Sequence, residues 1–348
     1  MQPISTALLS FGMSGKFFHA PFIQAHPGFL LSHVWERTHQ LAQKIYPNVQ
    51  TVRTFDEILL DPSIELIVVN TPTSTHFEYA RQAILSGKHV IVEKAFTTTV
   101  EEATTLCQLA KEKQVSLSVF QNRRWDSDFQ TVRRVLQSGE LGEMMEAEFH
   151  YDRFKEELSP KLHKETPQLG AGIVYDLGPH LIDQALVCFG FPQQVFADIR
   201  KTRAGSRVED YFEILLYYAN LRVRLKSGYY YREPIPAFTL FGKKGSFLKT
   251  RADVQENDLL ANIPPDSSLW GLEPDSEQGL LHTERNGTIF REKVATEKGN
   301  YGAYYQNIYQ HIRENAPLEV TGEDGIRVMK IIEAAYRSNQ ERRVMDVC

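Results

Sequence analysis

The sequence lacks the features that mark membrane-spanning, disulfide-rich and nucleic-acid-binding proteins. No apolar run approaches the ~20 residues that span a bilayer, and no basic segment followed by a cleavable apolar core opens the chain. Cys107, Cys188 and Cys348 are odd in number and far apart, which fits neither a disulfide framework nor a thiolate metal site. A net charge of -5 argues against a surface that grips nucleic acid or anionic lipid. We therefore expect a soluble, cytoplasmic protein with no nucleic-acid or membrane partner.

What the sequence does contain is an alternation of strand and helix patterns in its first third. A chain of 348 residues is long enough for two domains at ~150 residues each. Short continuous apolar runs, typical of strands buried on both faces, alternate with helical patterns. This rhythm predicts an α/β fold with a doubly wound parallel sheet over residues 1–122. The strand runs that carry the prediction are 4–10, 29–35, 66–69, 90–92 and 115–120.

The pattern changes in residues 123–348, which we interpret as a second domain. Alternating, aromatic-rich segments favour a large antiparallel sheet with one helix inserted in it and two late helices that close the chain. Residues 253–297 are rich in proline, glycine and charge, and no element is assigned there. The predicted strands are 146–153, 195–200, 211–218, 221–231, 238–241 and 247–250, and the predicted helices include 179–188, 304–315 and 322–338.

A glycine-bearing segment between the first strand and the first helix indicates a phosphate-binding loop. Gly12 would let the backbone approach a pyrophosphate, and Gly15 would allow close packing of helix on strand. The first glycine of the usual triplet is replaced by Ser10, so a simple strand-to-helix turn is the alternative. Glu36 ends the second strand, where an acid can accept hydrogen bonds from a ribose; it could also be a solvated surface acid. Arg37 could instead meet a 2′-phosphate, which leaves NAD and NADP both open.

Four further segments carry a family resemblance. Residues 18–21, Phe-His-Ala-Pro, follow the glycine loop, and residues 70–76 run from Asn-Thr-Pro to a histidine. Residues 87–94 end in Glu-Lys, and residues 170–180 form a glycine-rich segment that contains Asp176 and His180. In this order the motifs resemble those of the Gfo/Idh/MocA oxidoreductases, in particular the inositol and sugar dehydrogenases among them.

The resemblance implies a Rossmann domain, a C-terminal α/β domain with a large open sheet, and hydride exchange with NAD or NADP. It also implies a sugar, cyclitol or related polyol as substrate, and a homodimer or homotetramer formed through the sheet. Ligands of doubly wound sheets bind at the carboxyl ends of the strands, which places most of the expected cofactor contacts in one crevice. The expected contacts are Gly12, Met13, Ser14, Gly15, Glu36, Arg37, Thr71, Pro72, His76, Glu93, Gln121, Asn122 and Trp125.

One residue next to the predicted site departs from the family pattern. Ala95 follows Lys94 where the family commonly has a proline, often in a cis bond. A cis bond to a non-proline residue costs ~2.5–4 kcal/mol, so we expect the 94–95 bond to be trans. Trp125 could pack on the nicotinamide, or it could serve only in packing between the domains.

Three residues are the predicted catalytic group. Oxidation of a secondary alcohol needs a base, and His180 titrates in the suitable range. Asp176 stands four residues earlier and would share a helical face with it, to orient the ring or bind a hydroxyl. Lys94 would stabilise negative charge on the reacting oxygen. The structural alternatives are a solvated lysine, a backbone-bonded histidine and an aspartate that caps a helix.

The substrate side is less sharply defined. Arg153, with Tyr151 and His163, is expected to line it, although Arg153 could instead pair with Asp152. Asp176, His180 and Asp183 invite a metal interpretation, but no third strong ligand stands at regular spacing and we expect no metal. Two other functions use the same residues: a cofactor-binding regulator without turnover, and a reductase of a non-sugar carbonyl or imine.

Overall fold

The structure, a computed structural model, describes residues 2–160, 165–233 and 235–347. The chain forms two compact units. The first consists of residues 1–122, 255–270 and 300–326, and the second of residues 123–254, 271–299 and 327–348. Two late segments therefore belong to the N-terminal unit. In the described part of the chain, no helix has the length and apolar character to cross a membrane.

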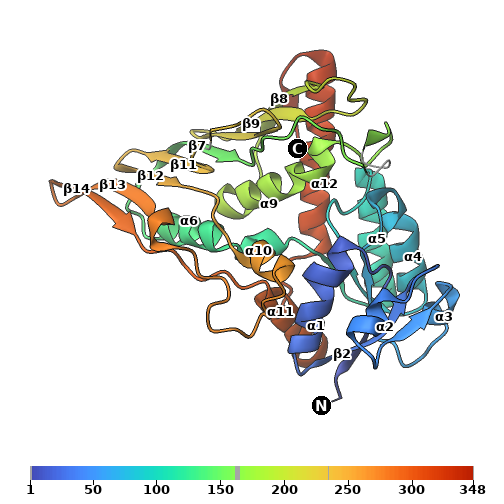
Figure 1. Ribbon diagram of the computed structural model, residues 1–348. Coiled ribbons are helices and arrows are strands. Elements are labelled where there is room, and N and C mark those ends of the chain that lie inside the picture. The colour runs from blue at the N-terminus through green and yellow to red at the C-terminus, as the bar shows by residue number, and fades with distance from the viewer. Residues whose placement is uncertain (1, 161–164, 234, 348) are drawn as a thin grey trace. The chain divides into compact units, whose positions relative to one another are not determined.

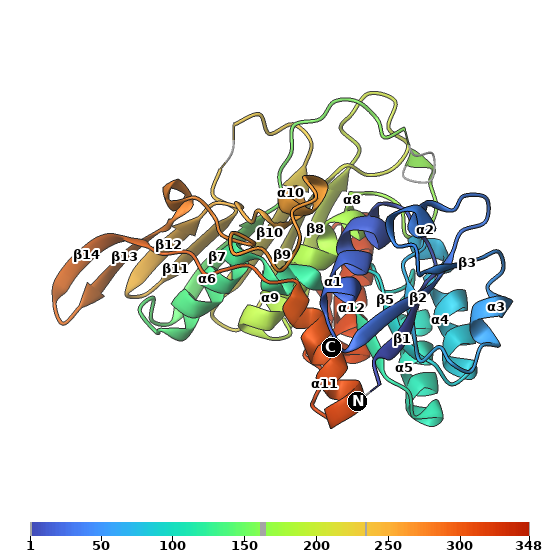
Figure 2. The ribbon, with the colours of Figure 1, turned by 60° about the horizontal axis from the view of Figure 1, so that its bottom comes forward.

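The first unit is built on a six-stranded parallel sheet in the order β3-β2-β1-β4-β5-β6. β4 is a fully buried run of branched apolar residues, and in β5 residues 90–92 are the same, as expected for strands covered on both faces. Figure 2 shows α4 and α5 together on one side of the sheet, and α11 beside α1 on the other. The elements are β1 Ile4–Leu8, a π-helix Ser14–His19, α1 Ala20–Ala25, β2 Phe29–Trp35, α2 Leu41–Ile45, β3 Gln50–Val52, α3 Asp56–Leu59, β4 Leu66–Val69, a 3₁₀ turn Thr73–Thr75, α4 His76–Leu85, β5 His89–Val92, α5 Val100–Lys113, β6 Leu117–Val119, α10 Gln255–Leu260 and α11 Gly302–Glu314.

The second unit contains a nine-stranded sheet in the order β14-β13-β12-β11-β7-β10-β9-β8-β15. Every pair is antiparallel except β7 with β10. Helices α6 and α9 lie against one face of this sheet (Figure 1). The elements are a 3₁₀ turn Asn122–Trp125, α6 Ser127–Gln137, β7 Met144–His150, α8 Ile173–Asp176, α9 Gly178–Phe189, β8 Gln194–Arg200, β9 Tyr211–Tyr217, β10 Arg222–Gly228, β11 Phe238–Gly242, β12 Gly245–Lys249, a 3₁₀ turn Asp275–Glu277, β13 Gly279–Arg285, β14 Thr288–Val294, α12 Gly322–Glu341 and β15 Met345–Asp346.

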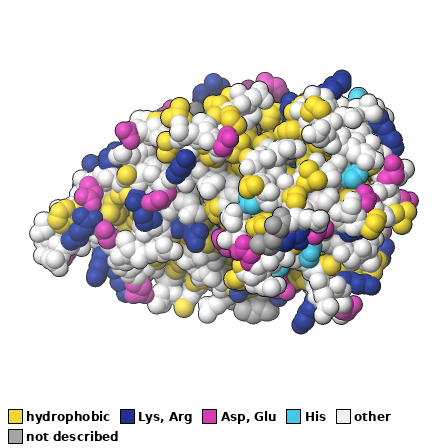
Figure 3. Space-filling model, turned by 90° about the horizontal axis from the view of Figure 1, so that it is seen from below, with side chains coloured by type: hydrophobic (Ala, Val, Ile, Leu, Met, Phe, Trp, Pro, Cys, Tyr) yellow, Lys and Arg dark blue, Asp and Glu magenta, His cyan; other side chains and the backbone are white. Residues whose placement is uncertain are grey.

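The predicted α/β fold class, with one parallel and one mostly antiparallel sheet, is confirmed. The segment without assigned elements, 253–297, holds α10 and the β13–β14 hairpin. Gly287, at φ +79°, supplies the left-handed turn of that hairpin. On the face seen in Figure 3, lysine and arginine side chains lie among aspartate and glutamate side chains.

Candidate active site

The loop after β1 is pinned to the end of β4 through Asn70. The Ser10 N–H donates to Oδ1 of Asn70, the Ser10 hydroxyl donates to the Asn70 carbonyl oxygen, and Nδ2 of Asn70 donates to the Ser10 carbonyl oxygen, each at 2.9 Å. A Cβ on Gly15 would lie 2.2 Å from the Ser10 carbonyl oxygen, so only glycine allows this close approach. A Cβ on Gly12 would meet nothing within 4 Å, which leaves open space over the loop. Ser10, which stands at the first glycine position of the usual triplet, thus keeps the turn closed through its bonds to Asn70.

Ser14, in the first helical turn, is joined to the carboxyl end of β5. Its hydroxyl donates to Oε1 of Glu93, and the backbone N–H of Lys94 donates to Oε2 at 3.2 Å. Burial would raise the pKa of Glu93, but the hydrogen bond and charge of His19, the Ser14 hydroxyl and the Lys94 charge together lower it to about 2. Glu93 is therefore ionised at neutral pH, and it connects the phosphate loop with the residue predicted to be catalytic.

The same carboxylate also bonds to His19, which sequence reasoning did not single out as a site residue. Nε2 of His19 lies 3.0 Å from Oε1 of Glu93, and Nδ1 lies 2.6 Å from the hydroxyl of Tyr305 on α11. His19 and Tyr305 are both completely buried. The Phe-His-Ala-Pro segment after the glycine loop was the only signal in the sequence that pointed to His19.

Glu36, at the end of β2, faces the N-terminus of α2. The backbone N–H groups of Leu41 and Ala42 donate to its two carboxylate oxygens at 2.9 and 3.0 Å, an arrangement that the helix dipole favours. The guanidinium of Arg53 donates to the carbonyl oxygen of Glu36 at 2.6 Å and so braces the β2–α2 loop. Arg37 is the exposed neighbour of this acid. Ribose binding by Glu36 stays a prediction.

His76 links two neighbouring strand ends. Its ring nitrogens lie 2.8 Å from the carbonyl oxygens of Thr71 and Ala95, and burial lowers its pKa. The trans bond expected between Lys94 and Ala95 is wrong, because the structure has this bond in cis. Local preference alone set that expectation, whereas Ala95 is buried here and its carbonyl oxygen faces His76.

The remaining expected cofactor contacts differ in exposure. Thr71 is partly exposed and Pro72 is exposed, and Met13 has 44% of its surface exposed. Gln121 and Asn122 follow β6 and are buried. Together with the open space over Gly12, these strand ends fit a dinucleotide that lies along the carboxyl edge of the sheet. Trp125 is buried and belongs to the second unit.

In the second unit, two short helices carry Asp176 and His180. Gly172, at φ +86°, precedes α8, and a Cβ there would lie 2.2 Å from a carboxylate oxygen of Glu209. Asp176 is the last residue of α8, and His180 is buried in the first turn of α9. The shared face of one helix is therefore replaced by a break at Leu177. Pro179, in that first turn of α9, needs no N–H partner.

The charge of Asp176 acts on the Arg153 side chain. Burial would lower the pKa of Arg153, but Tyr151, Asp176 and Tyr229 raise it. The guanidinium lies 5.1 Å from the centroid of the Tyr151 ring. The Arg153 N–H bonds to the Gly228 carbonyl oxygen at 3.0 Å, so the segment after β7 stays next to the end of β10. Tyr229 belongs to the same cluster.

The remaining sequence predictions concern Asp183, a metal site and His163. Asp183 makes a two-pronged ion pair with Arg124, with contacts of 2.7 and 2.8 Å. Among the described residues, no group of three or more His, Cys, Asp or Glu side chains is arranged to hold a metal ion. His163 lies outside the described residues.

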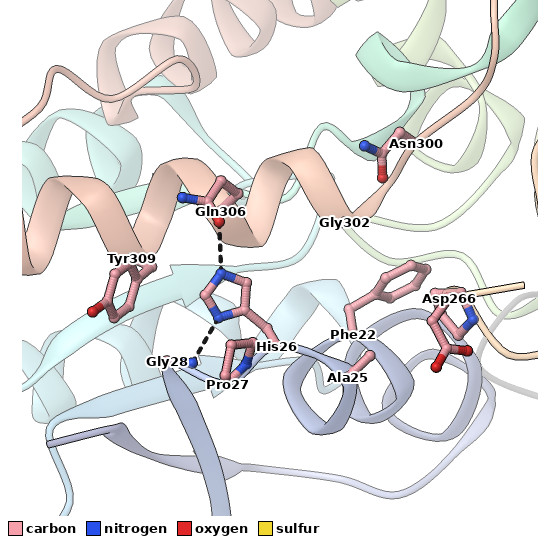
Figure 4. Close-up of a pocket in the computed structure, with 11 residues that line it drawn as sticks. Phe22, Ala25, His26, Pro27, Gly28, Asp266, Asn300, Gly302, Gln306 and Tyr309 are labelled. Atoms are coloured by element: carbon pink, nitrogen blue, oxygen red, sulfur yellow. Dashed lines mark hydrogen bonds between the residues drawn. The ribbon is translucent and has the colours of Figure 1, made fainter. Parts of the chain in front are cut away.

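A pocket of about 460 Å³ lies elsewhere on the first unit. Figure 4 shows His26 between Gln306 and the backbone N–H of Gly28, with Phe22 and Tyr309 on the walls. Gly28 precedes β2, whereas the residues of the candidate site follow the carboxyl ends of the strands. The pocket is therefore at the opposite edge of the sheet from the phosphate loop.

Comparison with known proteins yields matches along almost the whole chain. Residues 4–121 match the oxidoreductase family model for an NAD-binding Rossmann fold, and residues 133–347 match the model for the C-terminal alpha/beta domain of the same family. Scyllo-inositol 2-dehydrogenase (NADP(+)) IolW of Bacillus subtilis is 36% identical, over 99% of this chain and 96% of that protein. An oxidoreductase structure from Bacteroides fragilis is 45% identical with a TM-score of 0.91, covering 99% of this chain and 100% of that one. The structure of the oxidoreductase YvaA from Bacillus subtilis gives a TM-score of 0.96 at 36% identity, over 99% and 98% of the two chains.

Proposed function

The chain belongs to the Gfo/Idh/MocA family of oxidoreductases, and from this premise we propose that it transfers a hydride between NADP(H) and a secondary alcohol or ketone of a cyclitol. Its first unit is an NAD-binding Rossmann domain. The observation that carries the proposal is the bonded series from Ser14 of the phosphate loop through Glu93 to Lys94. Full-length similarity to an enzyme named for scyllo-inositol makes inositols the first substrates to test.

The roles of the polar side chains follow from what the reaction requires. The bound nicotinamide supplies the hydride acceptor for alcohol oxidation. Lys94 donates a hydrogen bond to the reacting oxygen and stabilises its negative charge. His180 accepts the hydroxyl proton, since imidazole titrates near neutral pH.

The charges of Arg153 and Asp176 favour a neutral polyol over an acidic compound as the substrate. The Asp176 carboxylate lies close enough to raise the pKa of Arg153, so the pair has little net charge. Such a pair supplies hydrogen-bond donors and acceptors without attracting a particular charge. Vicinal hydroxyl groups of an inositol match that combination.

NADP(H) is favoured by the loop after β2. The Glu36 carboxylate is buried and is oriented by the N-terminus of α2. Arg37 is exposed beside it and can pair with a 2′-phosphate.

We also propose that a second copy packs against the sheet face opposite α6 and α9. Along β9, Phe212 and Leu216 are buried, while the alternate residues Leu215 and Tyr217 remain partly exposed on the other face. Light scattering on the purified protein checks this, and a monomer at micromolar concentration contradicts it.

The test of function is a dehydrogenase screen of inositols, sugars and their keto derivatives with NADP and NAD in parallel. We expect turnover of an inositol, with a higher kcat/KM for NADP. Tight NADPH binding without turnover of any compound would instead support a cofactor-binding regulator. Failure to bind either cofactor would contradict both functions.

A further inference from the structure

A largely buried series of hydrogen bonds between polar side chains connects the phosphate loop with α11. It runs from the Ser14 hydroxyl to Glu93, from Glu93 to the His19 ring, and from His19 to the Tyr305 hydroxyl. Ser14 and His19 are the first and last residues of one helical segment, Glu93 follows β5 and Tyr305 lies on α11. The chain of contacts therefore connects three elements that are distant in the sequence.

The free-energy cost of burying the Glu93 carboxylate explains why it needs all of its hydrogen-bond donors. An ionised carboxylate without partners in a protein interior is strongly destabilising. Oε1 of Glu93 accepts hydrogen bonds from both Ser14 and His19, and Oε2 accepts one from the Lys94 backbone. Without His19, a nearly inaccessible carboxylate loses one of its two side-chain donors.

Tyr305 and the neighbouring rings fix where His19 can point. Nδ1 of the ring lies 2.6 Å from the Tyr305 hydroxyl, and the ring centroid lies 4.3 Å from that of Phe120. Tyr305 itself stacks on Phe22 at 6.1 Å with an interplanar angle of 7°. The imidazole is therefore held in one orientation that directs Nε2 at Glu93.

We propose that His19 and Tyr305 are positioning residues that hold Glu93 in the orientation that binds Ser14 and the Lys94 backbone. The Glu93 carboxylate transmits this constraint to two places at once. Through Ser14 it fixes the turn that accepts the pyrophosphate, and through the backbone N–H of Lys94 it fixes the residue beside the reacting oxygen. This role rests on the proposed function only for its effect on turnover, since its effect on cofactor affinity needs no substrate.

The experiment measures the NADPH dissociation constant by fluorescence titration of the purified full chain, without substrate. We expect His19→Leu to raise this constant by roughly tenfold or more, because a buried charge-assisted hydrogen bond is lost. His19→Gln keeps a donor in place of Nε2 and should recover most of the affinity. Tyr305→Phe removes only the hydroxyl and should raise the constant by ~3-fold.

Tyr304→Phe is the matched control. Tyr304 is as buried as Tyr305 on the same helix, but its hydroxyl pairs with Ser118 at 2.8 Å instead of with His19. Its NADPH affinity should equal that of the wild type. Equal affinities for Tyr305→Phe and Tyr304→Phe overturn the proposal, as does a folded His19→Leu protein with wild-type affinity.

If His19→Leu does not fold, the two tyrosine variants and His19→Gln still decide the matter. Once a substrate is found, kcat should fall in the same order as cofactor affinity. Absence of any substrate would count against the proposed function but would leave the affinity series intact. The two failures are therefore distinguishable.

Discussion

The two units hold their functional side chains in different ways. At the carboxyl edge of the parallel sheet, Glu93 is fixed by hydrogen bonds from Ser14 and His19, and Ser10 by three bonds to Asn70. In the second unit, Arg153 is held by a neighbouring charge and by aromatic rings, in a segment that follows a strand. A rigid edge suits a cofactor common to a whole family. A cluster built on connecting segments allows the substrate to vary between members.

The largest effect should come from Lys94→Ala. We expect kcat to fall by at least ~100-fold, because the reacting oxygen loses its electrostatic partner. Lys88→Ala is the matched control at the other end of β5, where Nζ donates to the carbonyl oxygens of Asp61 and Ile64. That variant should melt at a lower temperature and keep its kcat. Steady-state kinetics and a thermal melt check both, and equal kcat values for the two variants would remove Lys94 from the mechanism.

His180→Ala tests the second unit, where the proposed base lies. We expect kcat to fall by at least ~100-fold through loss of the base, with the NADPH dissociation constant unchanged. The exposed His282→Ala on β13 serves as the control and should retain full activity. A rate close to that of the wild type would mean that another group carries the proton.

Much of the fold was predictable because its patterns are local. Continuous apolar runs mark strands buried on both faces, and the spacing of Gly12 and Gly15 marks the turn between strand and helix. The partnership of His19 with Tyr305 was not predictable, since it depends on α11 returning to the first unit late in the chain. The break between Asp176 and His180 did have a local signal, because Pro179 favours a helix start and the predicted helix 179–188 begins there.

Arg153→Ala should have a smaller effect, on substrate affinity. If this side chain binds polyol hydroxyls, KM for the inositol should rise roughly tenfold, while NADPH affinity is unchanged. Asp176→Asn leaves the charge of Arg153 uncompensated. The rise in KM of the variant that carries both Arg153→Ala and Asp176→Asn should therefore be smaller than the product of the rises in the two single variants. Strict additivity in this double-mutant cycle would show that the two side chains act independently.

Arg37→Ala, at the carboxyl edge of the parallel sheet, should have the smallest effect. Arg37 is exposed, so its pairing with a 2′-phosphate is partly screened by solvent, and we expect kcat/KM for NADP to fall only ~10-fold. The value for NAD, which lacks that phosphate, should stay within a factor of ~2, since no other contact is removed. Arg53→Ala offers a contrast, because its guanidinium braces the carbonyl oxygens of Glu36 and His39 and its loss should weaken both cofactors alike. An equal fall for NADP and NAD in Arg37→Ala would place the 2′-phosphate elsewhere and leave Arg37 as a surface charge.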